Sequence, residues 1–240
     1  MTDTSEHERP SAPDRPAATA GPPVKRRSAI GILGGTFNPP HRGHIALARH
    51  AKIELGLDRV LLMPAHSAPH KSEEEDPGPQ RRLEMCRLAV GEAAGLQACG
   101  LEIERGGPSY TVDTLRAVHA SRPGAKLTFI VGADMAQTLP MWREPQALVE
   151  LADLAVAERE DAGREDVLRA LAPLSAEVMF LKMPLVEISS SLVRERVNAG
   201  GSIAGLVELE VGEYIAEHGL YRARSVAEAN MNTKAQAGAR

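Results

Sequence analysis

Two glycines and two histidines bracket residues 34–44, Gly-Gly-Thr-Phe-Asn-Pro-Pro-His-Arg-Gly-His, which directly follow an apolar run. Glycines after a strand allow a sharp turn and a close approach of the backbone to a ligand, because they carry no Cβ. His41 and His44 stand at positions i and i+3, which share one face of a helix. Since free N–H groups at a helix start favour an anion, the segment predicts a phosphate site.

Other interpretations of this segment have to be weighed. Zinc needs further ligands at workable spacing, and the chain has neither an HExxH motif nor a cysteine near the histidines. The glycines match neither a Walker loop nor the GxGxxG fingerprint, which argues against an ordinary dehydrogenase. A Gly-Gly turn or a lone HxxH pair is compatible with a structural role, but their combination favours phosphate.

A second cluster of the same chemical character lies late in the chain, in Ile-Ser-Ser-Ser-Leu-Val-Arg (188–194). Ser189 or Ser190 can cap a helix there, which is the ordinary role of a serine at that place. A single cap does not require three hydroxyls and an arginine. Ser190, Ser191 and Arg194 share one helical face, and together they predict a grip on a polyphosphate.

Apolar periodicity predicts the elements that position these residues. Short apolar runs predict strands at 29–33, 59–64, 98–103, 126–132, 153–158 and 177–183, and helices are expected at 44–55, 79–94, 111–121, 144–151, 163–171, 190–198 and 206–217. In the last of these, Val207, Val211 and Ile215 form one apolar stripe. The alternation predicts an α/β fold: a single-domain, Rossmann-like, doubly wound parallel sheet with helices on both faces.

Parallel sheets of this kind bind ligands at the carboxyl ends of their strands. The segments 34–44, 64–71, 132–134 and 187–194 each follow a predicted strand. They are therefore expected to meet at one edge of the sheet.

Composition limits the classes of function. With a net charge of −4, the chain lacks the basic excess of a general nucleic-acid binder. Cys86 and Cys99 lack CxxC spacing and fit a reducing compartment, and no apolar run is long enough for a membrane span or a signal peptide. We therefore expect a cytoplasmic protein with disordered tails at 1–27 and 223–240, a domain at 28–222 and a mobile polar loop at 73–80.

The two motifs together resemble the GGTFDPxHxGH and ISSTxxR signatures of the nucleotidyltransferase superfamily. Within it, the segments Pro-Ala-His-Ser-Ala-Pro-His-Lys (64–71), 108–115, 129–135, 139–142 and 214–222 resemble the bacterial nicotinate-nucleotide adenylyltransferases. The likeness covers residues 28–222. Two departures are mild: Asn38 replaces an aspartate and so supplies no carboxylate, whereas Ser191 replaces a threonine and keeps the hydroxyl.

The resemblance implies roles for matching positions. His41, His44 and Arg194 are the implied catalytic residues. The implied ATP-binding residues are these three together with Gly35, Thr36, Phe37, Lys71, Ser190 and Ser191. The implied residues for nicotinate mononucleotide are Thr36, Phe37, Thr111, Thr114, Gly132, Asp134, Trp142 and Arg143. No metal ligands are implied in the protein. Plainer roles stay open: Trp142 as a core aromatic, Lys71 as a solvated loop residue and Asp134 as a helix cap.

The implied reaction transfers the adenylyl group of ATP to nicotinate mononucleotide, with Mg²⁺ brought in by the ATP. Two alternatives remain: a related transferase for nicotinamide mononucleotide, phosphopantetheine or glycerol phosphate, and a nucleotide sensor without turnover. Neither a nucleic-acid nor a membrane partner is expected, and the sequence leaves homo-oligomerisation open.

Overall fold

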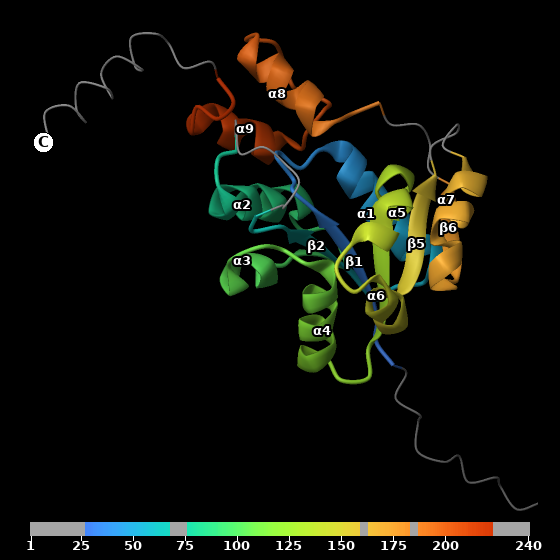
Figure 1. The fold of residues 1–240 in the computed structure, drawn as a ribbon. Coiled ribbons are helices and arrows are strands. Elements are labelled where there is room, and N and C mark those ends of the chain that lie inside the picture. The colour runs from blue at the N-terminus through green and yellow to red at the C-terminus, as the bar shows by residue number, and fades with distance from the viewer. Residues whose placement is uncertain (1–26, 68–75, 159–162, 183–186, 223–240) are drawn as a thin grey trace, which may run out of the picture.

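The structure, a computed structural model, describes residues 27–67, 76–158, 163–182 and 187–222. Its centre is a parallel sheet of six strands in the order β3-β2-β1-β4-β5-β6 (Figure 1). The strands are β1 (Ala29–Gly35), β2 (Arg59–Pro64), β3 (Leu96–Ala98), β4 (Lys126–Gly132), β5 (Asp153–Glu158) and β6 (Val178–Lys182). The predicted doubly wound sheet is confirmed.

Helices cover both faces of the sheet. On one face lie α1 (Arg42–Glu54), α2 (Pro79–Val90), α8 (Ser190–Asn198) and α9 (Leu209–Glu217). On the other lie α4 (Thr111–Ser121), α5 (Ala133–Thr138), α6 (Pro145–Leu151) and α7 (Arg164–Leu171). The short helices α3 (Leu101–Arg105), η1 (Leu139–Met141) and η2 (Ala172–Leu174) complete the described elements.

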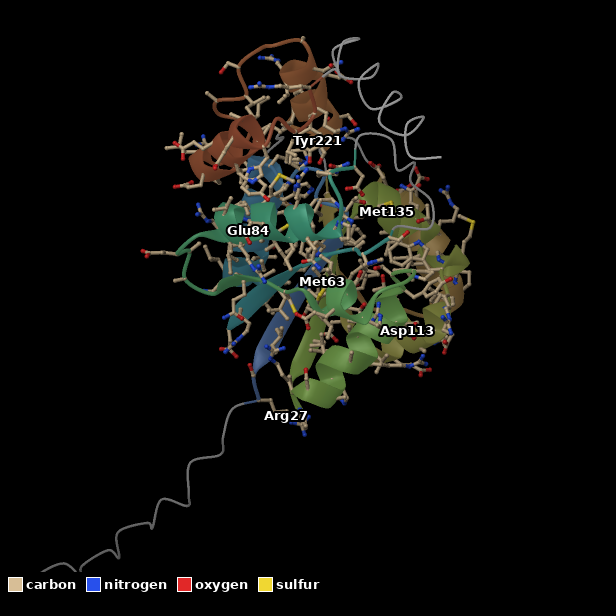
Figure 2. The ribbon with its side chains drawn as sticks, turned by 90° about the vertical axis from the view of Figure 1, so that its left-hand side faces the viewer. Arg27, Met63, Glu84, Asp113, Met135 and Tyr221 are labelled. Carbon is tan, nitrogen blue, oxygen red and sulfur yellow. The ribbon has the colours of Figure 1, made fainter. Side chains whose placement is uncertain are left out.

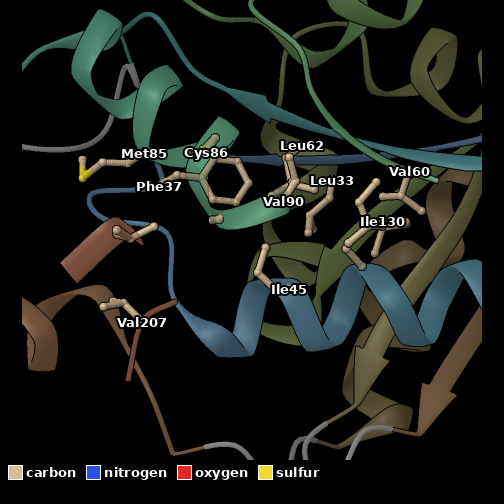
Figure 3. Close-up of a cluster of buried hydrophobic side chains, with 14 of the residues drawn as sticks. Leu33, Phe37, Ile45, Val60, Leu62, Met85, Cys86, Val90, Ile130 and Val207 are labelled. Atoms are coloured by element: carbon tan, nitrogen blue, oxygen red, sulfur yellow. The ribbon is translucent and has the colours of Figure 1, made fainter. Parts of the chain in front are cut away.

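Strand side chains alternate between two aliphatic cores, because successive residues of a strand point to opposite faces. In β2, Val60 and Leu62 enter the core under α1 and α2, shown in Figure 3, whereas Leu61 and Met63 enter the core under α4 and α6. Both faces of the strands are buried, as expected for a parallel sheet.

The third predicted strand is wrong in its position. The apolar run at 98–103 spans the end of β3 and the start of α3, which are separated by Cys99 and Gly100. An added Cβ at Gly100 would lie 2.9 Å from the Leu83 side chain, so the chain turns there in close contact with α2. Periodicity alone does not separate a short strand from a short buried helix.

Helix prediction was accurate in the second half of the chain and incomplete around β4. The predicted helix at 190–198 is α8, residue for residue, and 111–121 is α4. The stripe residues Val207, Val211 and Ile215 are all buried, although α9 begins only at Leu209. The six-residue α5 was not predicted, because it is too short to show a helical period.

Several expectations fall outside the described residues: the tails, except Arg27, and residues 73–75 of the loop at 73–80, whose last two residues, Pro79 and Gln80, begin α2. Among the helices that are described, none is long and apolar enough to cross a membrane.

Candidate active site

The carboxyl ends of the strands meet at one edge of the sheet, where α8 and α9 also lie (Figure 1). Figure 2 shows this edge from the side, with Tyr221 and Met135 near it and Arg27, which precedes β1, at the opposite end. All four segments singled out in the sequence therefore leave the sheet on the same side, as expected, although Lys71 and the rest of 68–75 lie outside the described residues.

The turn after β1 is made by Phe37 rather than by the glycines. Gly34 and Gly35 are the last residues of β1 and neither has a positive φ, whereas Phe37 has φ 52°. The Phe37 ring is buried in the core under α1, shown in Figure 3. An added Cβ at Gly35 would lie 3.2 Å from this ring, so the loop folds back closely on Gly35 and a side chain there would press on Phe37.

The two histidines, His41 as the N-cap of α1 and His44 in its first turn, pack ring against ring at a tilt. Their ring centroids are 3.7 Å apart, and the His41 backbone N–H donates to Nδ1 of His44 at 3.2 Å. Because a backbone N–H can only donate, Nδ1 is an acceptor and the neutral His44 ring carries its hydrogen on Nε2. The edge-on contact with Phe37, at 4.9 Å between centroids, further fixes the ring of His44. His44 is thereby oriented as an Nε2–H donor.

The late serine–arginine cluster contacts this loop directly. Ser190 Oγ donates to the carbonyl of Pro39 at 2.8 Å, and the Arg194 guanidinium donates to the carbonyl of Asn38 at 2.9 Å. These contacts join residues that are 151 and 156 positions apart. Ser189, not Ser190, is the helix cap, since its Oγ accepts from the backbone N–H of Leu192 at 3.1 Å. The structure thus brings the two sequence motifs together.

Asn38, which replaces the expected aspartate, has a defined structural role. Its Oδ1 accepts a hydrogen bond of 2.6 Å from the Tyr221 hydroxyl. Burial raises the pKa of Tyr221 well above its usual range, so the hydroxyl remains a neutral donor. The neutral amide oxygen meets this need without a carboxylate. Sequence analysis missed the pair, because nothing local indicates that residues 183 positions apart touch.

A buried arginine that sequence analysis also missed lies beneath the loop. Arg82 of α2 is 1% exposed, and its guanidinium donates to the carbonyls of Thr36, Ala65 and His66 and to the Asp76 carboxylate. A signal was present, since Arg82 shares a helical face with the buried Cys86 and Ala89 at i+4 and i+7. A charged residue on an apolar stripe indicates a specific buried partner.

On the other side of β1, Trp142 follows η1. It packs edge-on against Phe129, with centroids 6.0 Å apart, and its Nε1–H donates to Thr138 Oγ1 at 3.0 Å. The indole is partly buried against the core under α4 to α6. Trp142 therefore packs as a core aromatic, and its hydrogen bond to Thr138 also fixes the orientation of the indole.

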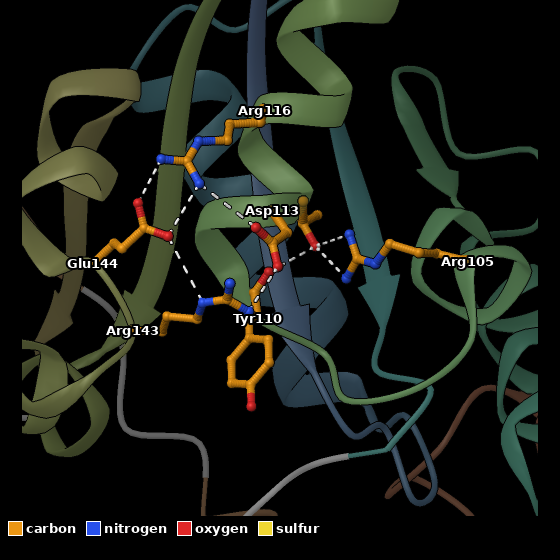
Figure 4. Close-up of polar contacts among 7 residues, drawn as sticks. Arg105, Tyr110, Asp113, Arg116, Arg143 and Glu144 are labelled. Carbon is orange, nitrogen blue, oxygen red and sulfur yellow. Dashed lines mark hydrogen bonds and ion pairs between the residues drawn. The ribbon is translucent and has the colours of Figure 1, made fainter.

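A network of charged groups ties α4 to the segment around Trp142 (Figure 4). Arg116 donates to Glu144 at 2.6 Å, and Arg143 lies 3.5 Å from Asp113 and stacks over the Tyr110 ring at 4.7 Å. Arg143, an expected mononucleotide ligand, is thus held beside the start of α4 by protein groups.

Thr111 and Thr114 occupy different environments despite belonging to one motif. Thr111 is half-buried at the first position of α4, where helix N–H groups begin. Thr114 is 1% exposed; its Oγ1 donates to Glu102 at 2.6 Å and accepts from Arg105 at 3.3 Å. The Thr114 hydroxyl is turned into the protein, where it holds α3 against α4, and its expected contact with the mononucleotide stays a prediction.

Gly132 and Asp134 stand where β4 passes into α5. Both are exposed, and an added Cβ at Gly132 would meet nothing within 4 Å. Asp134 lies in the first turn of α5 but does not cap it, since the cap residue is Gly132. The carboxylate therefore faces outward at the carboxyl edge of the sheet.

The groups gathered at this edge are imidazoles, hydroxyls, guanidinium groups and backbone amides. Within the described ranges, no group of three or more His, Cys, Asp or Glu side chains could hold a metal ion. These groups are hydrogen-bond donors, and no cluster of carboxylates among those described would repel a negative charge. Such an arrangement suits the binding of a polyanion.

Comparison with known proteins agrees with this geometry. Residues 32–196 match the cytidylyltransferase-like family. A probable nicotinate-nucleotide adenylyltransferase from Synechococcus sp. (strain JA-3-3Ab) is 40% identical over 202 residues, covering 83% of this chain and 98% of the relative. One from Geobacillus thermodenitrificans is 40% identical over 196 residues, covering 82% and 87%.

Among solved structures, the nicotinic acid mononucleotide adenylyltransferase of Plasmodium falciparum, complexed with NaAD, has a similar fold. The TM-score is 0.66 at 18% identity, with 81% of this chain and 98% of the other covered. The chain therefore belongs to the cytidylyltransferase-like family and groups within it with the nicotinate-nucleotide adenylyltransferases.

Proposed function

We propose that this protein transfers the adenylyl group of ATP to nicotinate mononucleotide, which yields nicotinate adenine dinucleotide (deamido-NAD) and pyrophosphate in NAD biosynthesis. The relatives named nicotinate-nucleotide adenylyltransferase support this reaction. The observation that carries it is the contact of Arg194 with the Asn38 carbonyl at 2.9 Å, because it joins the late motif to the loop that leads into the paired histidines.

The chemistry suits the groups at the edge of the sheet. The nucleophile is a phosphate monoester whose second pKa is about 6, so it is largely dianionic at neutral pH and needs no general base. It attacks the α-phosphorus in line, a P–O bond forms, and pyrophosphate leaves with the electron pair of the broken bond. The protein has to align two anions and offset their repulsion.

Each of the gathered groups has a place in this reaction. His41, His44 and Arg194 donate to the triphosphate, with His44 Nε2–H directed to charge that develops in the transition state. Ser190, Ser191 and Lys71 add donors for ATP, and the backbone at Gly35, Thr36 and Phe37 contacts the reacting phosphates. Because Ser190 also donates to Pro39, it fixes the loop as well.

The acceptor binds on the side of Trp142. The indole stacks on the pyridine ring, and backbone N–H groups at Thr111 and after Trp142 receive the nicotinate carboxylate. Gly132 and Asp134 hold ribose hydroxyls from the start of α5, and Arg143 adds positive charge. Charge-assisted hydrogen bonds are roughly twice as strong as neutral ones, so a carboxylate is preferred to an amide.

Mg²⁺ belongs to this proposal as a companion of ATP. The described residues offer it no carboxylate cluster, so the ion would be held through the substrate phosphates rather than in a protein cage. The ion supplies charge neutralisation on the phosphates. The proposed setting is the cytoplasm, in keeping with two free cysteines.

The test is pyrophosphate release from ATP with a panel of acceptors: nicotinate mononucleotide, nicotinamide mononucleotide, phosphopantetheine and glycerol phosphate. We expect the highest kcat/KM for nicotinate mononucleotide. A higher value for another acceptor would reassign the substrate. If no acceptor gave pyrophosphate, the protein would instead be a nucleotide-binding protein without turnover.

A further inference from the structure

We propose that Arg82 is a positioning residue for the reaction above, acting through the backbone of two loops rather than on the substrate. The proposal rests on the proposed function, because its measure is adenylyl transfer. It is carried by the geometry of one guanidinium buried between the loops that follow β1 and β2.

The Arg82 guanidinium makes four hydrogen bonds within the protein. Its Nη1 donates to the carbonyls of Thr36 and Ala65 at 2.8 and 2.7 Å, and its Nη2 donates to the carbonyl of His66 at 2.9 Å. Its Nε donates to Asp76 Oδ1 at 2.9 Å. Four of the donors of a planar group thus reach four acceptors, three of them backbone carbonyls.

These bonds determine the direction of the peptide between Thr36 and Phe37. When the Thr36 carbonyl is held toward Arg82, the N–H of Phe37 in the same planar peptide points the opposite way. The backbone at Thr36 and Phe37 contacts the reacting phosphates in the proposed function. Arg82 therefore controls the orientation of that backbone without touching ATP.

The same guanidinium extends this control toward the acceptor side. The backbone N–H of His66 donates to Ser109 Oγ at 2.9 Å, and Ser109 donates its N–H to the Ser67 carbonyl at 3.1 Å. Ser109 is two residues before Thr111, where α4 begins. Arg82 is thus at the junction of the proposed phosphate and mononucleotide sites.

Lysine cannot replace this arrangement, although it keeps the charge. Its ammonium is a single point on a flexible stem, whereas the guanidinium is a rigid fork. Substitution Arg82→Lys therefore leaves some of the carbonyls without their donor while the partly buried carboxylate of Asp76 keeps a cation.

The experiment compares R82K with R87K in the full chain. Arg87 lies on the same helix, is 58% exposed and pairs only with Glu84 among the contacts described for it, so R87K is the matched control. Misplaced reacting groups can cost about 10²-fold. We expect R82K to lower kcat by about 10- to 100-fold with KM for ATP nearly unchanged, and R87K to match the wild type.

Folding has to be separated from positioning. Rates are measured at a temperature where circular dichroism shows each variant fully folded, and R82A is assayed with and without added ethylguanidinium or ethylammonium. Recovery of kcat by the planar ion alone supports positioning. A wild-type kcat in folded R82K, or equal recovery by both ions, overturns it. An inactive wild type would instead refute the proposed function.

Discussion

At the scale of the residue, His44 is the most constrained side chain of the proposed phosphate site. Its Nδ1 accepts from the His41 backbone N–H, its ring packs at a tilt against the His41 ring, and it makes an edge-on contact with the Phe37 ring. These contacts leave one orientation and one neutral tautomer. A donor that is already oriented needs no reorganisation as charge develops, which is the condition for strong transition-state stabilisation.

The first prediction concerns this donor. We expect His44→Ala to lower kcat by about 10²-fold or more, as does the loss of one fixed donor to a developing charge. Pyrophosphate release at saturating ATP measures the change. His119→Ala serves as the control, because His119 is exposed on α4. An unchanged kcat in folded His44→Ala would show that His44 does not take part in the reaction.

At the scale of the element, β1 depends on a glycine that has no part in the proposed chemistry. An added Cβ at Gly31 would lie 2.7 Å from the Leu57 side chain, 2.9 Å from that of Ile130 and 3.0 Å from that of Val60. All three neighbours are buried, so none can move without disturbing the core that also holds Phe37. The strand is close-packed at this position.

We therefore expect Gly31→Ala to lower the free energy of unfolding by about 1–3 kcal/mol, the usual cost of overpacking. Urea unfolding followed by circular dichroism measures it. Gly34→Ala in the same strand is the matched control, since its Cβ would meet only the Phe129 ring at 3.5 Å. Equal stability of the two variants would show that the core yields at Gly31.

At the scale of the whole molecule, exposed ion pairs join α4 to the segment around Trp142, the two parts of the proposed mononucleotide site. Arg116 on α4 and Glu144 before α6 are 28 positions apart, and their side chains are 46% and 42% exposed. The hydrogen bond from Arg116 lowers the pKa of the Glu144 carboxyl. A lowered pKa in the folded state means that the pair adds stability above the ordinary carboxyl pKa. That stability is lost as the pH falls through the lowered value.

Glu144→Gln is thus expected to lower Tm slightly at neutral pH and low salt, since exposed pairs are weak and screened by salt. The difference from wild type should vanish as acid protonates Glu144. KM for nicotinate mononucleotide should rise a few-fold while that for ATP holds, because the pair orients α4 toward Trp142. Glu84→Gln, whose pair with Arg87 lies within α2, is the control for charge alone. A Tm difference that persists in acid would contradict the assignment.

The sequence alone determined the order of the elements and the two motifs that meet. Apolar runs and helical spacing depend on neighbours within a few residues, so β2, β4, β5, α4 and α8 were predicted at their observed bounds. The strand rule then placed the histidines and Arg194 at the same edge. Where a segment was too short to show a period, as at 98–103 and 133–138, the prediction failed.

Only the tertiary structure decided which side chains complete that edge. Arg82, Tyr221 and the burial of Thr114 depend on contacts over 12 to 183 positions of the chain. The sharp turn belongs to Phe37, whose ring the sheet and α1 enclose, and not to the glycines before it. Such contacts follow from strand order and close packing. Local sequence does not predict these contacts, because each one depends on how segments that are distant in the chain pack together.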